Sequence, residues 1–150
     1  MSMASRTATP ASDIEAIQAF YAALQAAVYN KDAAAMARHY APEAAIADLA
    51  PPLMRRGFDV GATQAWLDGW DGPVEVEMRD LVIEASGGLA LCYGLQYVRT
   101  RTREGEEAAW WSRITMALAS RQDGWQIIHE HNSVPFYMDG SYRAAVDLDP

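Results

Sequence analysis

The sequence predicts an α+β fold in which helices come first and a curved antiparallel sheet follows. Apolar residues recur three or four positions apart between residues 14 and 28, which is the spacing of an amphipathic helix. From residue 74 onward, long strand-like runs are separated by short turns, and Asp123-Gly124 is a strong hairpin signal. Helices followed by consecutive strands favour helices packed on one face of a sheet.

Three helices are predicted. The first helix is predicted to follow Ser12, which would cap its N-terminus in a capping-box pattern with Glu15. Asn30-Lys31-Asp32 ends this helix. The second precedes Pro42. The predicted helices span residues 14–28, 33–40 and 60–70, and the predicted strands span residues 44–48, 74–83, 89–103, 108–121 and 125–134.

The strand 108–121 carries bulky apolar side chains on both faces. A sheet with helices on one side should have a polar second face. We therefore expect a second copy of the protein to cover the outer face, as a homodimer. The outer residues are predicted to be Trp110, Ile114, Met116 and Leu118.

Composition limits the class of protein. We expect a single domain over residues 12–136, a disordered tail over 1–11 and a C-terminal extension over 137–150. The net charge of −8 argues against nucleic acid or an anionic membrane as partner, and no apolar run is long enough to span a bilayer. The single Cys92 predicts a buried reduced thiol in a cytoplasmic protein.

Three strings resemble the SnoaL-like (ketosteroid isomerase-like) branch of the nuclear transport factor two-like superfamily. They are YNKDAAAMARHYAPEAAIAD, SRITMAL and GWQIIHEHNSVPF, and the likeness extends from about Asp13 to Phe136. The resemblance implies a cone-shaped, curved antiparallel sheet wrapped around three N-terminal helices, which is a cystatin-like roll with a central pocket. It also implies a dimer. Members of the family include isomerases, cyclases, dehydratases, hydrolases and proteins without known activity, so the fold does not name a reaction.

The resemblance places Asp48 at the general-base position of the family's steroid isomerases. The oxyanion partners of that class have no counterpart, because Leu24 occupies the helix position, with Tyr21 one turn earlier, and Ile114 or Thr115 the strand position. Asp48 is therefore either a catalytic base or a residue that caps the turn before Pro51-Pro52.

Arg113 matches an arginine that lines the pocket in kinase association-domain relatives. Strand alternation puts it on one face with Trp111 and Thr115, which we predict to be concave. Arg113 would then pair with Asp48 or with a ligand carboxylate.

His129 and His131 lie two positions apart, so both rings share one strand face. Two histidines without a third nearby ligand do not make a zinc site, and no metal is predicted. We expect His131 to face the pocket as a proton-transfer group beside Arg113, or to belong to a hydrogen-bonded structural pair with His129. A one-residue bulge in this strand would turn both histidines to the opposite face of the sheet.

The predicted function is a small-molecule pocket with general acid–base chemistry on an apolar or aromatic substrate, of the isomerase, dehydratase or cyclase type. Asp48 and His131 would be catalytic, and no cofactor motif is present. The substrate-binding residues are predicted to be Tyr21, Trp66, Tyr93, Trp111, Arg113 and His129. The alternative is a non-catalytic ligand-binding or oligomerisation module.

Overall fold

A computed structural model describes residues 8–150 of the chain, and residues 1–7 of the predicted tail lie outside this range. The elements are α1 (Ala11–Tyr29), α2 (Ala33–Ala37), β1 (Tyr40–Ala47), β2 (Arg55–Arg56), α3 (Val60–Asp68), β3 (Glu75–Ser86), β4 (Leu89–Arg101), β5 (Glu107–Arg121) and β6 (Gly124–Ser133). The predicted α+β class is confirmed. The short strand β2 was not predicted, and the second helix ends earlier than expected because β1 begins at Tyr40.

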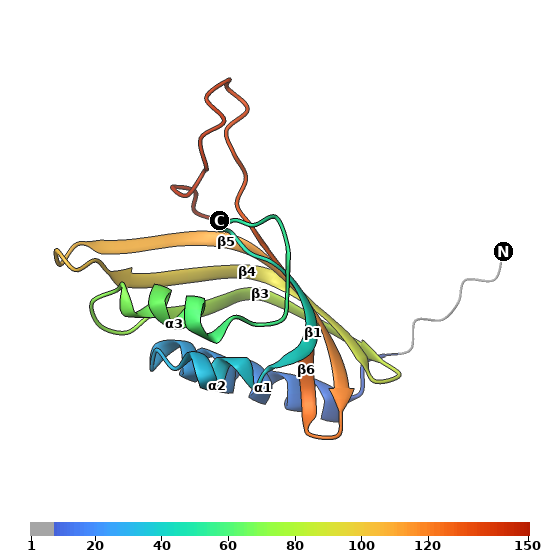
Figure 1. The fold of residues 1–150 in the computed structure, drawn as a ribbon. Coiled ribbons are helices and arrows are strands. Elements are labelled where there is room, and N and C mark those ends of the chain that lie inside the picture. The colour runs from blue at the N-terminus through green and yellow to red at the C-terminus, as the bar shows by residue number, and fades with distance from the viewer. Residues whose placement is uncertain (1–7) are drawn as a thin grey trace.

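The six strands form one sheet in the order β2-β1-β6-β5-β4-β3. All neighbours are antiparallel except β1 and β6, which run parallel. Figure 1 shows the sheet curling so that α1 and α2 lie inside the curve, with α3 on the same side. The helices thus cover one face of the sheet.

Irregular positions bend the long strands. The register between β3 and β4 shifts between Arg79 and Val82, where Asp80 adopts a positive φ of 55°. Gly94 of β4 faces this bulge, and a Cβ atom there would lie 2.8 Å from the carbonyl oxygen of Arg79. Only glycine permits this close approach of the two backbones.

The core lies between α1 and the concave face. Ile17 is fully buried against strand residues such as Leu118 and Ile127, which are also fully buried. A smaller cluster, with Ala33 and Leu67 at its centre, joins α2 and α3 to β3 and β4. Burying one such aliphatic side chain contributes about 1.5–3 kcal/mol.

The predicted faces of β5 are wrong. Trp110 and Met116 line the concave side, and Ile114 and Leu118 belong to the core, so these residues cannot form the expected dimer face. Ile114, Met116 and Leu118 pack with residues of α1 in the main core, and Trp110 packs in the smaller cluster beside Trp70.

The C-terminal residues 137–150 extend beyond the sheet. Phe136 pairs with Ala144, and the backbone N–H of Tyr137 donates to the carbonyl of Arg143. Figure 1 shows this hairpin projecting away from the helices. Across residues 8–150, no helix is long and apolar enough to cross a membrane.

Candidate active site

A cavity of about 420 Å³ lies between the helices and the concave face of the sheet. Ligand sites for small molecules are usually of this size and largely apolar, with a few placed polar groups. Its apolar wall includes Leu24, Val28, Met36, Ile46, Phe58, Val76, Met78, Val98, Trp110 and Met116. Its charged lining consists of Asp48, Arg55 and Glu130.

Strand pairing brings the charged residues to one end of this cavity. Arg55 of β2 lies opposite Ile46 of β1, which lies opposite Glu130 of β6, which in turn lies opposite Met116 of β5. Residues directly opposite one another share a face of the sheet, so all four point inward. Asn132 follows Glu130 on the same face two residues later.

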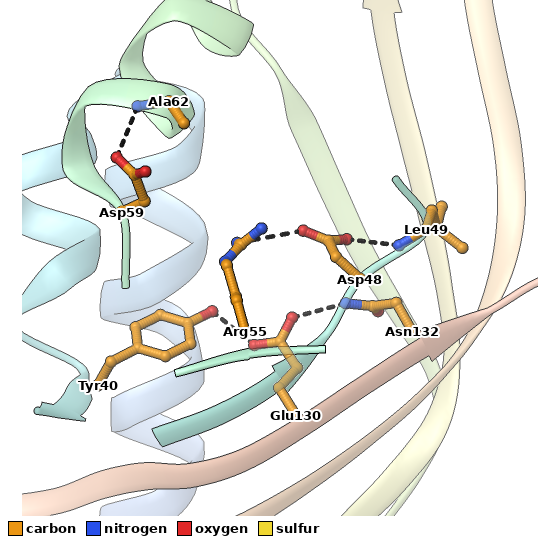
Figure 2. A network of polar contacts seen from close by, with 8 residues as sticks. All are labelled: Tyr40, Asp48, Leu49, Arg55, Asp59, Ala62, Glu130 and Asn132. Carbon is orange, nitrogen blue, oxygen red and sulfur yellow. Dashed lines mark hydrogen bonds and ion pairs between the residues drawn. The ribbon is translucent and has the colours of Figure 1, made fainter. Parts of the chain in front are cut away.

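Glu130 is the centre of a hydrogen-bonded network. The Tyr40 hydroxyl donates to Glu130 Oε2 at 2.5 Å, and Asn132 Nδ2 donates to Glu130 Oε1 at 2.6 Å. Figure 2 shows Tyr40 and Asn132 approaching the carboxyl from opposite sides. Because Glu130 is only 7% exposed, this carboxyl is taken out of water at the wall of an otherwise apolar cavity.

Burial raises the pKa of Glu130, and the charge of nearby Asp48 raises it further. Hydrogen bonds from Tyr40 and Asn132 and the charge of Arg55 act in the opposite direction, because they favour the ionised carboxylate. Burial also raises the pKa of Tyr40 well above its usual value, with Glu130 adding to the effect. Tyr40 is therefore a permanent hydrogen-bond donor.

Asp48 lies at the edge of the same network, and its side chain is 39% exposed. Its Oδ1 accepts a hydrogen bond from the backbone N–H of Leu49 at 2.8 Å, at the start of the turn that leads to Pro51-Pro52. Its Oδ2 lies 3.5 Å from an Arg55 guanidinium nitrogen (Figure 2). Asp48 also lines the cavity, so its carboxylate is placed to meet a ligand.

Two further predicted site residues line the cavity. Tyr21 of α1 is buried there, and its hydroxyl donates to Met116 Sδ at 3.4 Å. Trp66 of α3 lines the opening and is 45% exposed. The rings of Trp66 and Trp70 pack edge to face, and Trp70 in turn contacts Trp110.

Three predicted residues lie on the opposite face of the sheet. Arg113 is exposed there, Trp111 stacks on Tyr97 with ring centroids 4.7 Å apart, and Tyr93 is 41% exposed. The prediction that this face is concave is wrong. Strand β5 carries apolar residues on both sides, so alternation could not distinguish them.

The prediction that His131 faces the cavity is also wrong. The pairing of β5 with β6 shifts between Ala117 and Leu118, so Ile128 is an extra residue in β6. Ile127 faces the core, and after the bulge Glu130 and Asn132 face the cavity while His129 and His131 face outward. His131 does lie near Arg113, as expected, because it pairs with Thr115, two residues from Arg113 in β5. Both side chains are on the outer face of the sheet and not on the cavity side.

Sequence reasoning missed four residues of the site, namely Tyr40, Arg55, Glu130 and Asn132. The two adjacent isoleucines, Ile127 and Ile128, were the one local sign of a bulge, because they interrupt the alternation. Arg55 comes from a two-residue strand that no periodicity could reveal.

The described part of the chain contains no group of three or more His, Cys, Asp or Glu side chains arranged to hold a metal ion. The polar end of the cavity thus offers carboxyl, hydroxyl, amide and guanidinium groups. These groups can exchange protons with a ligand and orient it.

A curved sheet closed by helices over one polar-ended cavity defines a small-molecule pocket protein of the nuclear transport factor two-like class. A model of the SnoaL-like domain matches residues 17–137. The chain belongs to the SnoaL-like family, which confirms the resemblance and the cystatin-like fold.

Solved structures agree. A nuclear transport factor two-like protein of unknown function from Pseudomonas putida is 27% identical, with a TM-score of 0.82 over 96% of this chain and 100% of that one. A protein of the same family from Streptomyces avermitilis, proposed to be a dehydratase, is 14% identical, with a TM-score of 0.73 over 83% and 97% of the two chains.

A proposed calcium/calmodulin-dependent protein kinase II association domain from Xanthomonas campestris is 18% identical, with a TM-score of 0.72 over 89% of this chain and 96% of that one. These two more distant similarities show the fold alone. No curated protein matches the chain significantly.

Proposed function

We propose that the protein catalyses a cofactor-free proton transfer on a small, largely apolar molecule, as an isomerase or lyase does. The observation that carries this proposal is Glu130, a buried carboxyl with a raised pKa at the wall of an apolar cavity. Asp48 lines the same cavity in a more exposed setting, beside Arg55. Two carboxyls in different environments can divide the roles of acid and base.

In the proposed mechanism Asp48 removes a proton from a carbon atom of the substrate. The electron pair moves toward an oxygen atom of the substrate, and protonated Glu130 donates its proton to that oxygen. Tyr40 and Asn132 hold the Glu130 carboxyl in place throughout, since each donates to one of its oxygens. The Streptomyces avermitilis relative is consistent with lyase chemistry on this fold.

A nitrobenzisoxazole tests this chemistry without knowledge of the natural substrate. A base removes the proton from its ring carbon, the N–O bond breaks, and a coloured cyano-nitrophenolate forms. We expect saturable turnover that exceeds the rate in the same concentration of acetate. Asp48→Asn should lower kcat about a hundredfold or more, because it removes the base.

Glu130→Gln should lower the rate less and remove the fall in rate at high pH, because the wild-type acid loses its proton there. Asp59→Asn is the matched control. Asp59 caps α3 through the backbone N–H of Ala62 and lies outside the cavity lining, and asparagine also serves as a cap. Turnover no faster than acetate, or full activity in Asp48→Asn, contradicts the proposal.

The second candidate is a ligand-binding protein without turnover. Both oxygens of Asp48 already have partners, Leu49 and Arg55, which favours a structural carboxylate. Saturable binding of the probe without product formation would support this candidate. In either case we propose a cytoplasmic protein that does not bind nucleic acid or membranes, on the basis of its single cysteine and its net charge of −8.

A further inference from the structure

Two polar atoms at the charged end of the cavity have unused hydrogen-bonding capacity. Arg55 Nε and Asn132 Oδ1 are shielded from solvent and have no partner among residues 8–150. Buried polar atoms in native proteins are nearly always paired, so each unpaired one calls for an explanation. Both residues line the cavity, so one donor and one acceptor remain for its ligand.

The contacts of these side chains decide which atoms are free. Asn132 uses Nδ2 to donate to Glu130 at 2.6 Å, which leaves its Oδ1 as an acceptor. Arg55 makes a single 3.5 Å contact to Asp48, which is longer than an ordinary charge-assisted hydrogen bond. A guanidinium group has five N–H donors, so Arg55 retains donors for a ligand.

The backbone places these two groups close together. Arg55 lies two strands from Glu130 in the same row of the sheet, and Asn132 is the next inward residue of β6. Adjacent strands are about 4.8 Å apart, so the long Arg55 side chain spans the distance to the β6 side chains. Figure 2 shows Arg55, Asp48, Glu130 and Asn132 converging on one region.

The two unpaired atoms do not suit an ionic ligand group. A ligand carboxylate would meet the carboxylate of Asp48 and would bring no donor for Asn132 Oδ1. An ammonium group would bring no acceptor for Arg55. A neutral group that contains both an acceptor and a donor satisfies both atoms.

We infer that the ligand of this cavity is a neutral, largely apolar molecule with a carbonyl oxygen next to an N–H or O–H group, such as a carboxamide. The carbonyl accepts from Arg55, and the N–H or O–H donates to Asn132 Oδ1. The inference rests on the proposed function, because it describes the substrate of the same cavity. The apolar walls hold the remainder of the molecule.

Three ligands with the same two-ring aromatic body test the inference by calorimetry on the full chain. Naphthamide has both an acceptor and a donor, methyl naphthyl ketone has only the acceptor, and naphthoate is anionic. We expect naphthamide to bind at least about tenfold more tightly than the ketone, since the ketone leaves Asn132 Oδ1 unpaired. Naphthoate should bind most weakly.

Variants then assign the two contacts. Asn132→Leu should remove the preference for the amide over the ketone, and Arg55→Met should weaken the binding of both. Arg56→Met is the matched control, because Arg56 is exposed and its side chain donates to the carbonyl oxygen of Glu43, outside the cavity lining. It should leave all three affinities unchanged.

Equal affinity for amide and ketone, tightest binding of naphthoate, or no binding of any ligand at its solubility limit overturns the inference. The comparison of ligands uses the unmodified protein, so it does not depend on whether a variant folds. It also uses no catalytic readout. A chain that prefers naphthamide but does not turn over the nitrobenzisoxazole contradicts the proposed catalysis alone.

Discussion

Glu130 occupies a position where a carboxyl group destabilises the native state unless it is well paired. Moving a charged group out of water costs several kcal/mol even after the protein relaxes. Tyr40 and Asn132 offset part of this cost with short hydrogen bonds, and the raised pKa shows that burial outweighs them. An apolar residue would fill the position at lower cost, so the carboxyl points to a role in the cavity.

This balance predicts how stability depends on pH. The pKa of Glu130 is higher in the native chain than its ordinary value of 4.5. Between the two values the native state binds more protons than the unfolded state, so the free energy of unfolding falls as the pH rises through that window. Urea denaturation at a series of pH values should show this fall in the wild type, and Glu130→Gln should show much less of it.

Glu43→Gln is the control for this experiment. Glu43 is exposed, and its pKa is lowered by a backbone hydrogen bond and by its ion pair with Arg121. The Glu43→Gln variant should therefore show the same fall in the free energy of unfolding with rising pH as the wild type. If Glu130→Gln reproduces the wild-type profile, Glu130 does not carry the proton that we assign to it.

Helices α1 and α3 differ in whether a side chain accepts a hydrogen bond from a free backbone N–H group at the N-terminus. Helix α3 begins after Asp59, whose side chain accepts from the backbone N–H of Ala62 at 2.9 Å. Helix α1 begins after Pro10, without a side-chain cap, although Ser12 and Glu15 were expected to form a capping box. The helix starts one residue before Ser12, so this serine lies inside the first turn, where it cannot act as the cap.

The difference predicts a loss of stability for one alanine substitution and little change for another. Asp59→Ala should lower the free energy of unfolding by about 1 kcal/mol, because it leaves the N–H of Ala62 without its partner. It should also weaken ligand binding, since α3 carries Trp66 at the cavity opening. Ser12→Ala should change stability by less than about 0.5 kcal/mol. Chemical denaturation measures both, and a large loss in Ser12→Ala would show that the serine does cap α1.

At the scale of the whole molecule, no helix covers the outer face of the sheet among residues 8–150 (Figure 1). This outer face carries exposed apolar residues on β3 and β4, namely Val82, Leu89, Leu91 and Tyr93. Apolar patches of this kind mark interaction sites in soluble proteins. We propose that a second copy of the chain covers it, with these residues in place of the four β5 residues first expected.

Sedimentation at micromolar concentration should therefore give about twice the chain mass of 16.5 kDa. Leu91→Arg should shift the protein toward the monomer, because it buries a charge in the interface. Leu53→Arg is the matched control, since Leu53 is 98% exposed in the loop between β1 and β2 and is not part of β3 or β4. A wild-type monomer, or a dimer unaffected by Leu91→Arg, contradicts this assignment.

Local sequence was sufficient for the order of the helices and of every strand except β2. The 3.6-residue period of α1 depends on neighbouring residues alone, and the structure has this helix. The hairpin between β5 and β6 is also present, but its turn lies at Gln122-Asp123, one residue earlier than predicted, because Arg121 pairs with Gly124. Tyr21 and Asp48 were identified through the family resemblance, and Trp66 was identified as an aromatic residue on a predicted helix. The family resemblance also held for the fold.

The polar centre of the cavity depended on long-range pairing. The Ile128 bulge lies in the pairing of β6 with β5, and it reverses every later side chain in β6. Glu130 thus reaches Tyr40, which is 90 residues away in the chain, and Asn132 faces the same cavity. Successive side chains of a strand point alternately inward and outward. One extra residue therefore turns Glu130 toward the cavity and His131 away from it.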